Sequence, residues 1–312
     1  MNKFKAFVIV FILISFKTFA CLNGETKYLK NGERAYIDFR GLVPHGHNFT
    51  ISEFPKLISE LEKLYKKTRD IDYLSDKGYV LIIQKKYDEA LKLYLNIEKI
   101  KPNRYSTASN IGTLYELIGE NQKAYDWIKR SIQINPESHS GSEWLHLKIL
   151  EAKIKNYEGV NGGFLTNNSF GKEAIPKTNL SKKELRKFAQ SVYFQVNERM
   201  SFIKPKDHII SVLLFELGNA VEILGENENA IQIYRKAKEY GFQDKLINRR
   251  LTHCYQSRAN YSKRQNQKEI GIIEKENKAE INIIWIILSI ITCVLLIGLL
   301  IFFFKRKNFN NI

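Results

Sequence analysis

The stretch LGNAVEILGENENAIQIYRKA, residues 217–237, decides the fold. It has the spacing of two amphipathic helices separated by Gly225, and small residues recur within both helices. A glycine inside a helix costs about 1 kcal/mol relative to alanine, so Gly218 needs a structural reason. A repeat of the same spacing elsewhere in the chain would supply that reason.

The same spacing does recur. Three small or helix-ending residues are repeated at a distance of 34 residues, as Gly78, Ala90 and Pro102 and again as Gly112, Ala124 and Pro136. Around the opening stretch, Gly218 and Ala230 keep the same separation and Ala237 follows. This pattern resembles the tetratricopeptide repeat, a helix–turn–helix unit of 34 residues. Small residues on both helices would let the two backbones of a unit approach closely, and each proline would end a second helix.

The resemblance implies an all-α fold, a tetratricopeptide-type helical-hairpin solenoid over residues 55–242. We expect units at about 71–104, 105–138 and 205–242. Residues 139–204 would form an interrupted unit, because 156–179 hold many glycines and no periodicity and predict a long loop. Asn31-Gly32 lies between apolar stretches, which predicts a small hairpin in the N-terminal region 21–54.

Both ends of the chain carry apolar stretches that set its location. Residues 1–20 have lysines, then an apolar run, then Ala20, the order of a secretory signal peptide; an uncleaved anchor is the alternative. Residues 283–304 contain no charge, and 22 residues give about 33 Å of helix, enough to span a bilayer. The basic residues at 305–307 favour a cytoplasmic C-terminus. We therefore expect a bacterial exported protein of the cell membrane with a single transmembrane helix, a polar stalk at 243–282, a cytoplasmic tail at 305–312, and the bulk of the chain outside the cytoplasm.

The net charge of +16 does not indicate a nucleic-acid partner. Six basic residues lie in 1–20 and 305–312, which hold no acid, so +10 remains for the rest of the chain. There, basic and acidic residues are interleaved, which is typical of a solvated surface. We expect no nucleic acid among the partners.

The three cysteines are Cys21, Cys254 and Cys293. Cys293 falls inside the expected membrane span. Cys21 would be the first residue after cleavage, so three fates stay open for it: a free thiol, a disulfide with Cys254, or lipid modification.

The sequence contains no recognisable catalytic constellation. His45 and His47 are the only close histidine pair, and two histidines are too few for a metal site. Phosphate-binding loops, nucleophile elbows and HExxH motifs are absent from the sequence. We expect no catalytic residue, metal or cofactor, and keep an enzyme with a site near these two histidines as the less favoured alternative.

The resemblance implies that the first helices of the units line a concave groove that binds a protein or peptide. The groove positions implied on this chain are Ser75, Asp76 and Tyr79; Ser109, Asn110 and Thr113; Glu143, Trp144 and Leu147; and Phe215, Glu216 and Asn219. Some family members bind a partner's C-terminal carboxylate with Lys, Asn and Arg at such positions, and here only Asn110 matches. The expected function is therefore a non-catalytic, membrane-anchored interaction scaffold, or alternatively a subunit of an envelope transport or assembly complex.

Overall fold

The computed structural model describes residues 25–38, 41–156 and 159–309. The expected signal peptide at 1–20 and Cys21 lie outside the described residues. The chain divides into two units, Met1–Cys254 and Tyr255–Ile312, and each is described by itself.

The first unit begins with a two-stranded antiparallel sheet, β1 (Glu25–Tyr28) and β2 (Arg34–Asp38). The Asn31-Gly32 turn joins the strands, and Gly32 has a φ of 88°, a conformation that glycine adopts at little cost. Ala35 and Tyr36 are buried in one apolar cluster with Leu57 and Leu61 of the first helix. The hairpin is therefore held to the helical array by apolar packing.

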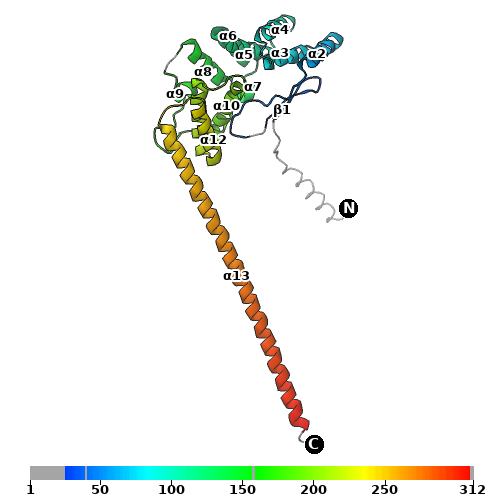
Figure 1. The fold of residues 1–312 in the computed structure, drawn as a ribbon, viewed down its shortest axis with the longest axis vertical. Helices are drawn as coiled ribbons and strands as arrows, with labels where there is room; N and C mark the ends of the chain where they lie inside the picture. Colours follow the sequence, from blue (N-terminus) through cyan, green and yellow to red (C-terminus); the bar gives the residue numbers. More distant parts are fainter. Residues whose placement is uncertain (1–24, 39–40, 157–158, 310–312) are drawn as a thin grey trace. The chain divides into compact units, whose positions relative to one another are not determined.

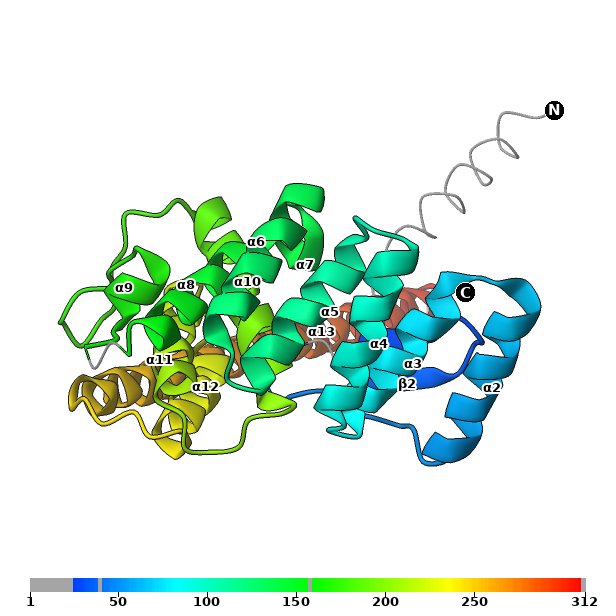
Figure 2. The same cartoon turned by 90° about the horizontal axis from the view of Figure 1, so that it is seen from above.

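Helices in pairs form the rest of this unit (Figure 1). Those of the first half are α2 (Phe54–Thr68), α3 (Ile71–Ile83), α4 (Tyr87–Ile100), α5 (Tyr105–Leu117) and α6 (Asn121–Ile134). Consecutive helices of this set pack on one another, and seen from above they follow in order across the unit (Figure 2). The second half holds α7 (Ser138–Gly141), α8 (Glu143–Ile154), α9 (Gly162–Thr166), α10 (Lys182–Met200), α11 (His208–Ile223) and α12 (Asn227–Glu239).

The repeated glycines are needed because a large side chain occupies the space beside each of them. A Cβ on Gly78 would lie 2.5 Å from the ring of Tyr94, and one on Gly218 would lie 2.5 Å from the ring of Tyr234. Gly112 has the same relation to Ile128. In each pair the large residue follows the glycine by 16 positions. The sequence predicted close approach of two backbones, whereas the structure shows mainly a side chain seated against a glycine.

The repeated alanines and prolines also have structural reasons. The alanines of the second helices are fully buried: Ala90, Ala124, Ala230 and Ala237. α4 and α6 end two residues before Pro102 and Pro136, consistent with a residue that cannot continue a helix.

The turns between paired helices share one hydrogen-bond pattern. In the second pair, the N–H of Gly119 donates to Glu116 O and the N–H of Glu120 donates to Tyr115 O. The same two bonds close the turns at Lys85 and at Gly225. This is the Schellman motif, whose central residue has a positive φ and is usually glycine. Lys85 holds that position with a φ of 60°, so it adopts a conformation that is costly for a side chain with a Cβ.

We expect Lys85→Gly to raise the free energy of unfolding by roughly 0.5–1 kcal/mol. The left-handed conformation costs a non-glycine residue about 1–2 kcal/mol, and the larger chain entropy of unfolded glycine offsets part of the gain. Urea unfolding of the full chain followed by tryptophan fluorescence measures the change. Gly119→Lys is the matched control, and it should destabilise by a similar amount because the space around Gly119 is open. An unchanged midpoint for both variants would contradict this explanation.

The interrupted region differs from a regular unit. His139 and Gly141, both within the short α7, have positive φ, at 49° and 65°, and α8 begins two residues after Gly141. After α8 the chain forms α9 and an extended segment before α10 begins at a capping box made by Ser181 and Glu184. The region therefore supplies one long helix, α10, that is not part of a 34-residue pair.

The last helix, α13, runs from Leu246 to Phe309. A search of the described residues finds no helix with both the length and the apolar character needed to cross a membrane. Within the expected span at 283–304, the side chains of 294–296 and 299–304 lie outside the described part of the structure.

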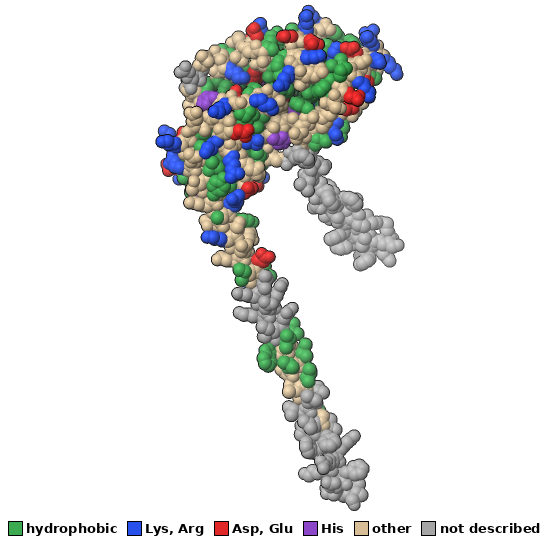
Figure 3. All heavy atoms as spheres, viewed as in Figure 1, with side chains coloured by type: hydrophobic (Ala, Val, Ile, Leu, Met, Phe, Trp, Pro, Cys, Tyr) green, Lys and Arg blue, Asp and Glu red, His purple; other side chains and the backbone are tan. Residues whose placement is uncertain are grey.

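Charged side chains of both signs are interleaved over the surface of the helical unit (Figure 3). Several form ion pairs between neighbouring helices, such as Lys77 of α3 with Glu62 of α2 at 2.5 Å. In the face that is visible, the basic residues form no continuous block.

Candidate functional site

A cavity of about 580 Å³, called the first cavity below, lies against the first helices of two successive units. α3 and α5 form one side of it, the β1–β2 hairpin forms an edge, and α10 supplies two more lining residues, Phe194 and Glu198. It gathers the residues that the resemblance implied for these two units: Ser75, Asp76, Tyr79, Ser109, Asn110 and Thr113. The cavity therefore combines hydroxyl, amide, carboxyl and aromatic groups.

Tyr94 links the packing of the first pair to the cavity. Its ring fills the space beside Gly78, and its hydroxyl donates to the carbonyl of Ser75 at 2.7 Å. The same hydroxyl accepts a hydrogen bond from Asn110 at 2.9 Å. Burial raises the pKa of Tyr94, so the group stays a neutral phenol. The helix packing thus fixes the position of Asn110 in the wall.

The hairpin forms the edge of the first cavity through polar contacts. The backbone N–H of Lys30 donates to Asp76 at 2.5 Å, and the side chain of Lys30 pairs with Asp70 at 3.3 Å. Lys27 lies over the ring of Tyr79 at 5.1 Å from its centroid. Burial raises the pKa of Asp76, while the bond from Lys30 opposes that change. A groove-facing carboxylate therefore already receives a backbone N–H from the turn between β1 and β2.

Arg104 brings a further positive charge to the cavity. Its guanidinium pairs with Asp72, and both residues line the cavity. Asp72 and Arg104 were not among the predicted groove residues. Asp72 lies three residues before Ser75, so extending that face back by one turn would have found it. Arg104 is the residue before α5 and lies outside the helical face, so the period of the helix does not indicate it.

A network of buried ion pairs lies next to the first cavity, where Tyr105 and His139 form part of its lining. Glu143 accepts from Tyr105 at 3.1 Å and from His139 at 2.7 Å, and it also pairs with His146 at 3.1 Å. Burial opposes ionisation of Glu143, but the two histidines hold its pKa far below the ordinary value. Beyond it lies a smaller hollow of about 60 Å³ that shares Ser109 and other residues with the first cavity.

α10 contributes residues that the sequence did not indicate. Phe194 and Glu198, four residues apart on one face of the helix, line the first cavity, and Phe202 joins them from the turn just after α10. Their spacing was visible in the sequence, but nothing in it showed that α10 returns to the face of α3 and α5.

The third set of predicted groove residues is divided by the structure. Glu143 faces the cavity network, whereas Trp144 is 37% exposed and lines none of the cavities described here. Leu147 packs against the cluster that contains Ala124 and Ile128 instead. The break at His139 and Gly141 interrupts the helix, so counting 34 residues on from Asn110 and Thr113 does not reach the cavity-facing positions of α8.

The fourth set of predicted groove residues does not line the first cavity. Phe215, Glu216 and Asn219 line a different cavity of about 740 Å³, called the second cavity below, with residues of the 156–179 loop. The first and second cavities share no lining residue. The single continuous groove that was expected is therefore two separate sites in this structure.

The histidine pair of the N-terminal region has a different role from the one considered in the enzyme alternative. Nδ1 of His47 bonds Asp38 at 2.5 Å, and Nε2 bonds Glu198 at 2.8 Å. Burial lowers the pKa of His47, but the two carboxylates together raise it to about 9. Because both ring nitrogens are engaged, the imidazolium ties the N-terminal region to α10 and is not poised as a general base. His45 is exposed, and its backbone N–H bonds Asn197 at 3.0 Å.

Metal and thiol chemistry have little support in this part of the chain. Among the described residues, no group of three or more His, Cys, Asp or Glu is arranged to hold a metal ion. Cys254 is a buried free thiol, and burial raises its pKa. Its expected alternative partner, Cys21, lies outside the described residues.

Comparison with known proteins finds a family match over most of α11 and α12. Residues 212–240 match the family model described as a tetratricopeptide repeat. Over 222 residues the chain is 23% identical to a TPR repeat-containing protein of Methanocaldococcus jannaschii, covering 66% of this chain and 39% of that protein. The chain thus spans about two fifths of the length of this relative. The family match confirms that the chain contains a tetratricopeptide repeat, at the stretch from which the repeat was first recognised.

Solved structures similar to this chain include MamA, with 14% identity and a TM-score of 0.33 over 60% of this chain and 88% of that one. A tetratricopeptide repeat protein from Parabacteroides merdae has 16% identity and a TM-score of 0.32, covering 65% of this chain and 93% of that one.

Proposed function

We propose that this chain is a non-catalytic scaffold that binds a protein segment in the first cavity. The observation that carries the proposal is the convergence of Ser75, Asp76 and Tyr79 of α3 with Ser109, Asn110 and Thr113 of α5 on one cavity. Tetratricopeptide repeats are protein-interaction modules, and this cavity lies on the first helices of two repeat-like pairs.

The chemistry of the wall favours an extended segment bound through its backbone. Asp76 already accepts a backbone N–H from Lys30 in the β1–β2 turn, so this carboxylate can accept a main-chain donor. Asn110 and the three hydroxyl groups add donors and acceptors, and Tyr79 adds aromatic area of the kind that carries binding energy at interfaces.

A free carboxylate is a less suitable ligand group for this cavity. Of the cations that line it, Lys30 and Arg104 are paired with Asp70 and Asp72, and Lys27 lies over the ring of Tyr79. A C-terminal carboxylate would therefore compete with acids that the chain itself supplies. This argument agrees with the poor match to the carboxylate-binding pattern in the sequence.

We expect Tyr79→Ala to weaken binding of the partner by about 2 kcal/mol or more, which is roughly 30-fold. The partner is first identified by placing a photo-crosslinking amino acid at Ser106, at the cavity, and then its affinity is measured with the full-length chain. Trp144→Ala is the matched control, because it removes an aromatic residue that lies outside the cavity. Equal affinity of the Tyr79→Ala protein and the unaltered chain would contradict the assignment.

We further propose that the chain is exported and anchored by residues 283–304 with its C-terminus in the cytoplasm. The support is the absence of charge in this stretch and the three basic residues after it. In a chain without its native cysteines, a new cysteine after Lys307 should resist a thiol reagent that cannot cross membranes. A cysteine at Ser257 should react. Labelling of the C-terminal cysteine in intact cells would reverse the topology.

A further inference from the structure

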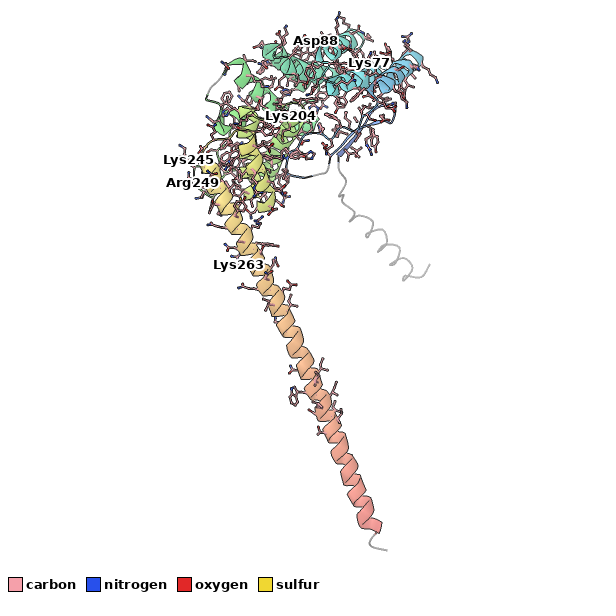
Figure 4. The ribbon with its side chains drawn as sticks, viewed as in Figure 1. Lys77, Asp88, Lys204, Lys245, Arg249 and Lys263 are labelled. Atoms are coloured by element: carbon pink, nitrogen blue, oxygen red, sulfur yellow. The ribbon has the colours of Figure 1, made fainter. Side chains whose placement is uncertain are left out.

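The second cavity has a composition that the scaffold proposal does not use. It lies between the 160–172 segment, α11 and the residues after α12. Arg249 holds the rim of this segment through a hydrogen bond to the carbonyl of Lys172 at 3.1 Å, and it lies at the start of α13 (Figure 4). Phe215 and Phe242 form a stacked aromatic wall, with ring centroids 4.3 Å apart.

Glu216 is the unusual group in this cavity. Its residue is 8% exposed, and one carboxyl oxygen accepts from Asn219 at 3.2 Å. Across the described residues, no cationic side chain forms an ion pair with Glu216, whose carboxylate therefore lacks a counter-ion. Burial raises the pKa of Glu216, and the charge of Arg250 opposes this rise from beyond the distance of an ion pair. The guanidinium of Arg250 donates to the carbonyls of Phe170 and Gly171.

The other deeply buried acids of the unit each have a cationic partner. Asp38 pairs with His47, Glu116 pairs with His146, Lys153 and Arg199, Glu143 pairs with His139 and His146, and Glu222 pairs with His253. A buried carboxylate without a partner is costly. Burial raises the pKa of Glu216 to about 7, which reflects that cost.

The loop makes room for this carboxylate. A Cβ on Gly162 would lie 1.7 Å from Oε1 of Glu216. Any other residue at this position would displace the Glu216 side chain or the loop. Gly162 thus lets the loop lie close over a carboxylate that lines the cavity.

The first repeat-like pair has an acidic residue at the position equivalent to Glu216, and that residue has a hydrogen-bond donor. Asp76 and Glu216 each precede the repeat glycine by two residues, Gly78 in one pair and Gly218 in the other. Asp76 accepts an N–H from Lys30. Among the described residues, no backbone N–H donates to the carboxylate of Glu216.

We propose that the second cavity binds the primary ammonium group of a ligand, with Glu216 as its counter-ion and the adjoining apolar part of the ligand against Phe215 and Phe242. An ammonium supplies both the missing positive charge and several N–H donors. This chemistry is shared by small amines and by the N-terminus of a peptide. The other lining residues with ionisable side chains are Lys172, Lys206, His208, Tyr240 and Asp244.

Calorimetric titration of the full-length chain at pH 7.5 tests the proposal. The probes are 2-phenylethylamine and the tripeptide Phe-Ala-Ala, each compared with its N-acetyl derivative. Acetylation keeps the aromatic group but removes the ammonium, and we expect it to weaken binding at least tenfold. Binding of both amines indicates a site for small amines, whereas binding of the tripeptide alone indicates a site for peptide N-termini.

Glu216→Gln should weaken the amine probes at least tenfold, while Glu239→Gln, an exposed position on α12, should not. The comparison of free and acetylated probes uses the unaltered chain, so it decides the question even if Glu216→Gln fails to fold. Equal binding of a probe and its acetylated form, or no binding of either amine, would overturn the proposal. Unchanged affinity in a folded Glu216→Gln chain would overturn it as well.

Discussion

Replacing Glu116 with glutamine is expected to lower the free energy of unfolding by about 3–5 kcal/mol, the usual cost of removing one partner from a buried ion pair. Its carboxylate is 7% exposed and lies within 2.7 Å of both His146 Nε2 and Lys153 Nζ, and within 3.0 Å of Arg199. Burial opposes its ionisation, but these three cations hold the pKa of Glu116 well below the ordinary value. Glutamine keeps the shape but removes the carboxylate that pairs with Lys153 and Arg199, while His146 keeps its pair with Glu143.

The measurement is urea unfolding of the full chain at neutral pH, followed by tryptophan fluorescence. Glu120→Gln, at the N-cap of α6, is the matched control, because its pair with Lys123 is exposed on both sides and surface pairs contribute about 1 kcal/mol or less. A loss below about 1 kcal/mol for Glu116→Gln would mean that water, and not this carboxylate, balances the cations.

The pairing of helices could be predicted from the sequence because each repeat glycine contacts a residue that is close to it in the sequence. Gly78, Gly112 and Gly218 each precede a large residue by 16 positions, and a helix–turn–helix of fixed length brings the two together whatever surrounds them. The groove positions of α3 and α5 were implied by the family resemblance, and they line one cavity because both helices belong to regular pairs.

The prediction failed where the chain leaves that period. His139 and Gly141 break the helix before α8, so the face containing Trp144 cannot be obtained by counting on from Asn110. A positive φ at a histidine has no reliable sequence signal. The sequence also could not show that α10 completes the first cavity, because that contact depends on a long connection whose path is set by tertiary packing.

Buried charges were missed for a related reason. Glu116, His146 and Arg199 are far apart in the sequence and come from three helices. Each alone has the pattern of an ordinary polar residue, and only the packing of α5, α8 and α10 brings them together. The buried ion-pair network therefore depends on the tertiary structure, and the spacing of the repeats does not predict it.

The pH dependence of stability should reveal the other large buried pair. His47 has a side chain 5% exposed between Asp38 and Glu198. Its pKa is raised from 6.5 to about 9 in the folded chain. Stability from a raised pKa is fully present below the unfolded value and is lost as pH rises through the folded value. At about 1.4 kcal/mol for each pKa unit, the loss between pH 6.5 and pH 9 should be about 3 kcal/mol.

The experiment compares urea unfolding of the unaltered chain and of His47→Gln at several pH values from 6 to 9.5. His146 also has a raised pKa and titrates in the same background, so the difference between the two proteins isolates His47. That difference should be largest at pH 6 and should shrink as pH rises, because neutral His47 no longer attracts both carboxylates. His45→Gln, at the exposed histidine two residues away, should follow the unaltered chain throughout. A difference that stays constant across the range would mean that His47 stabilises the fold through packing on Tyr36, with which it stacks at 4.0 Å, and not through its charge.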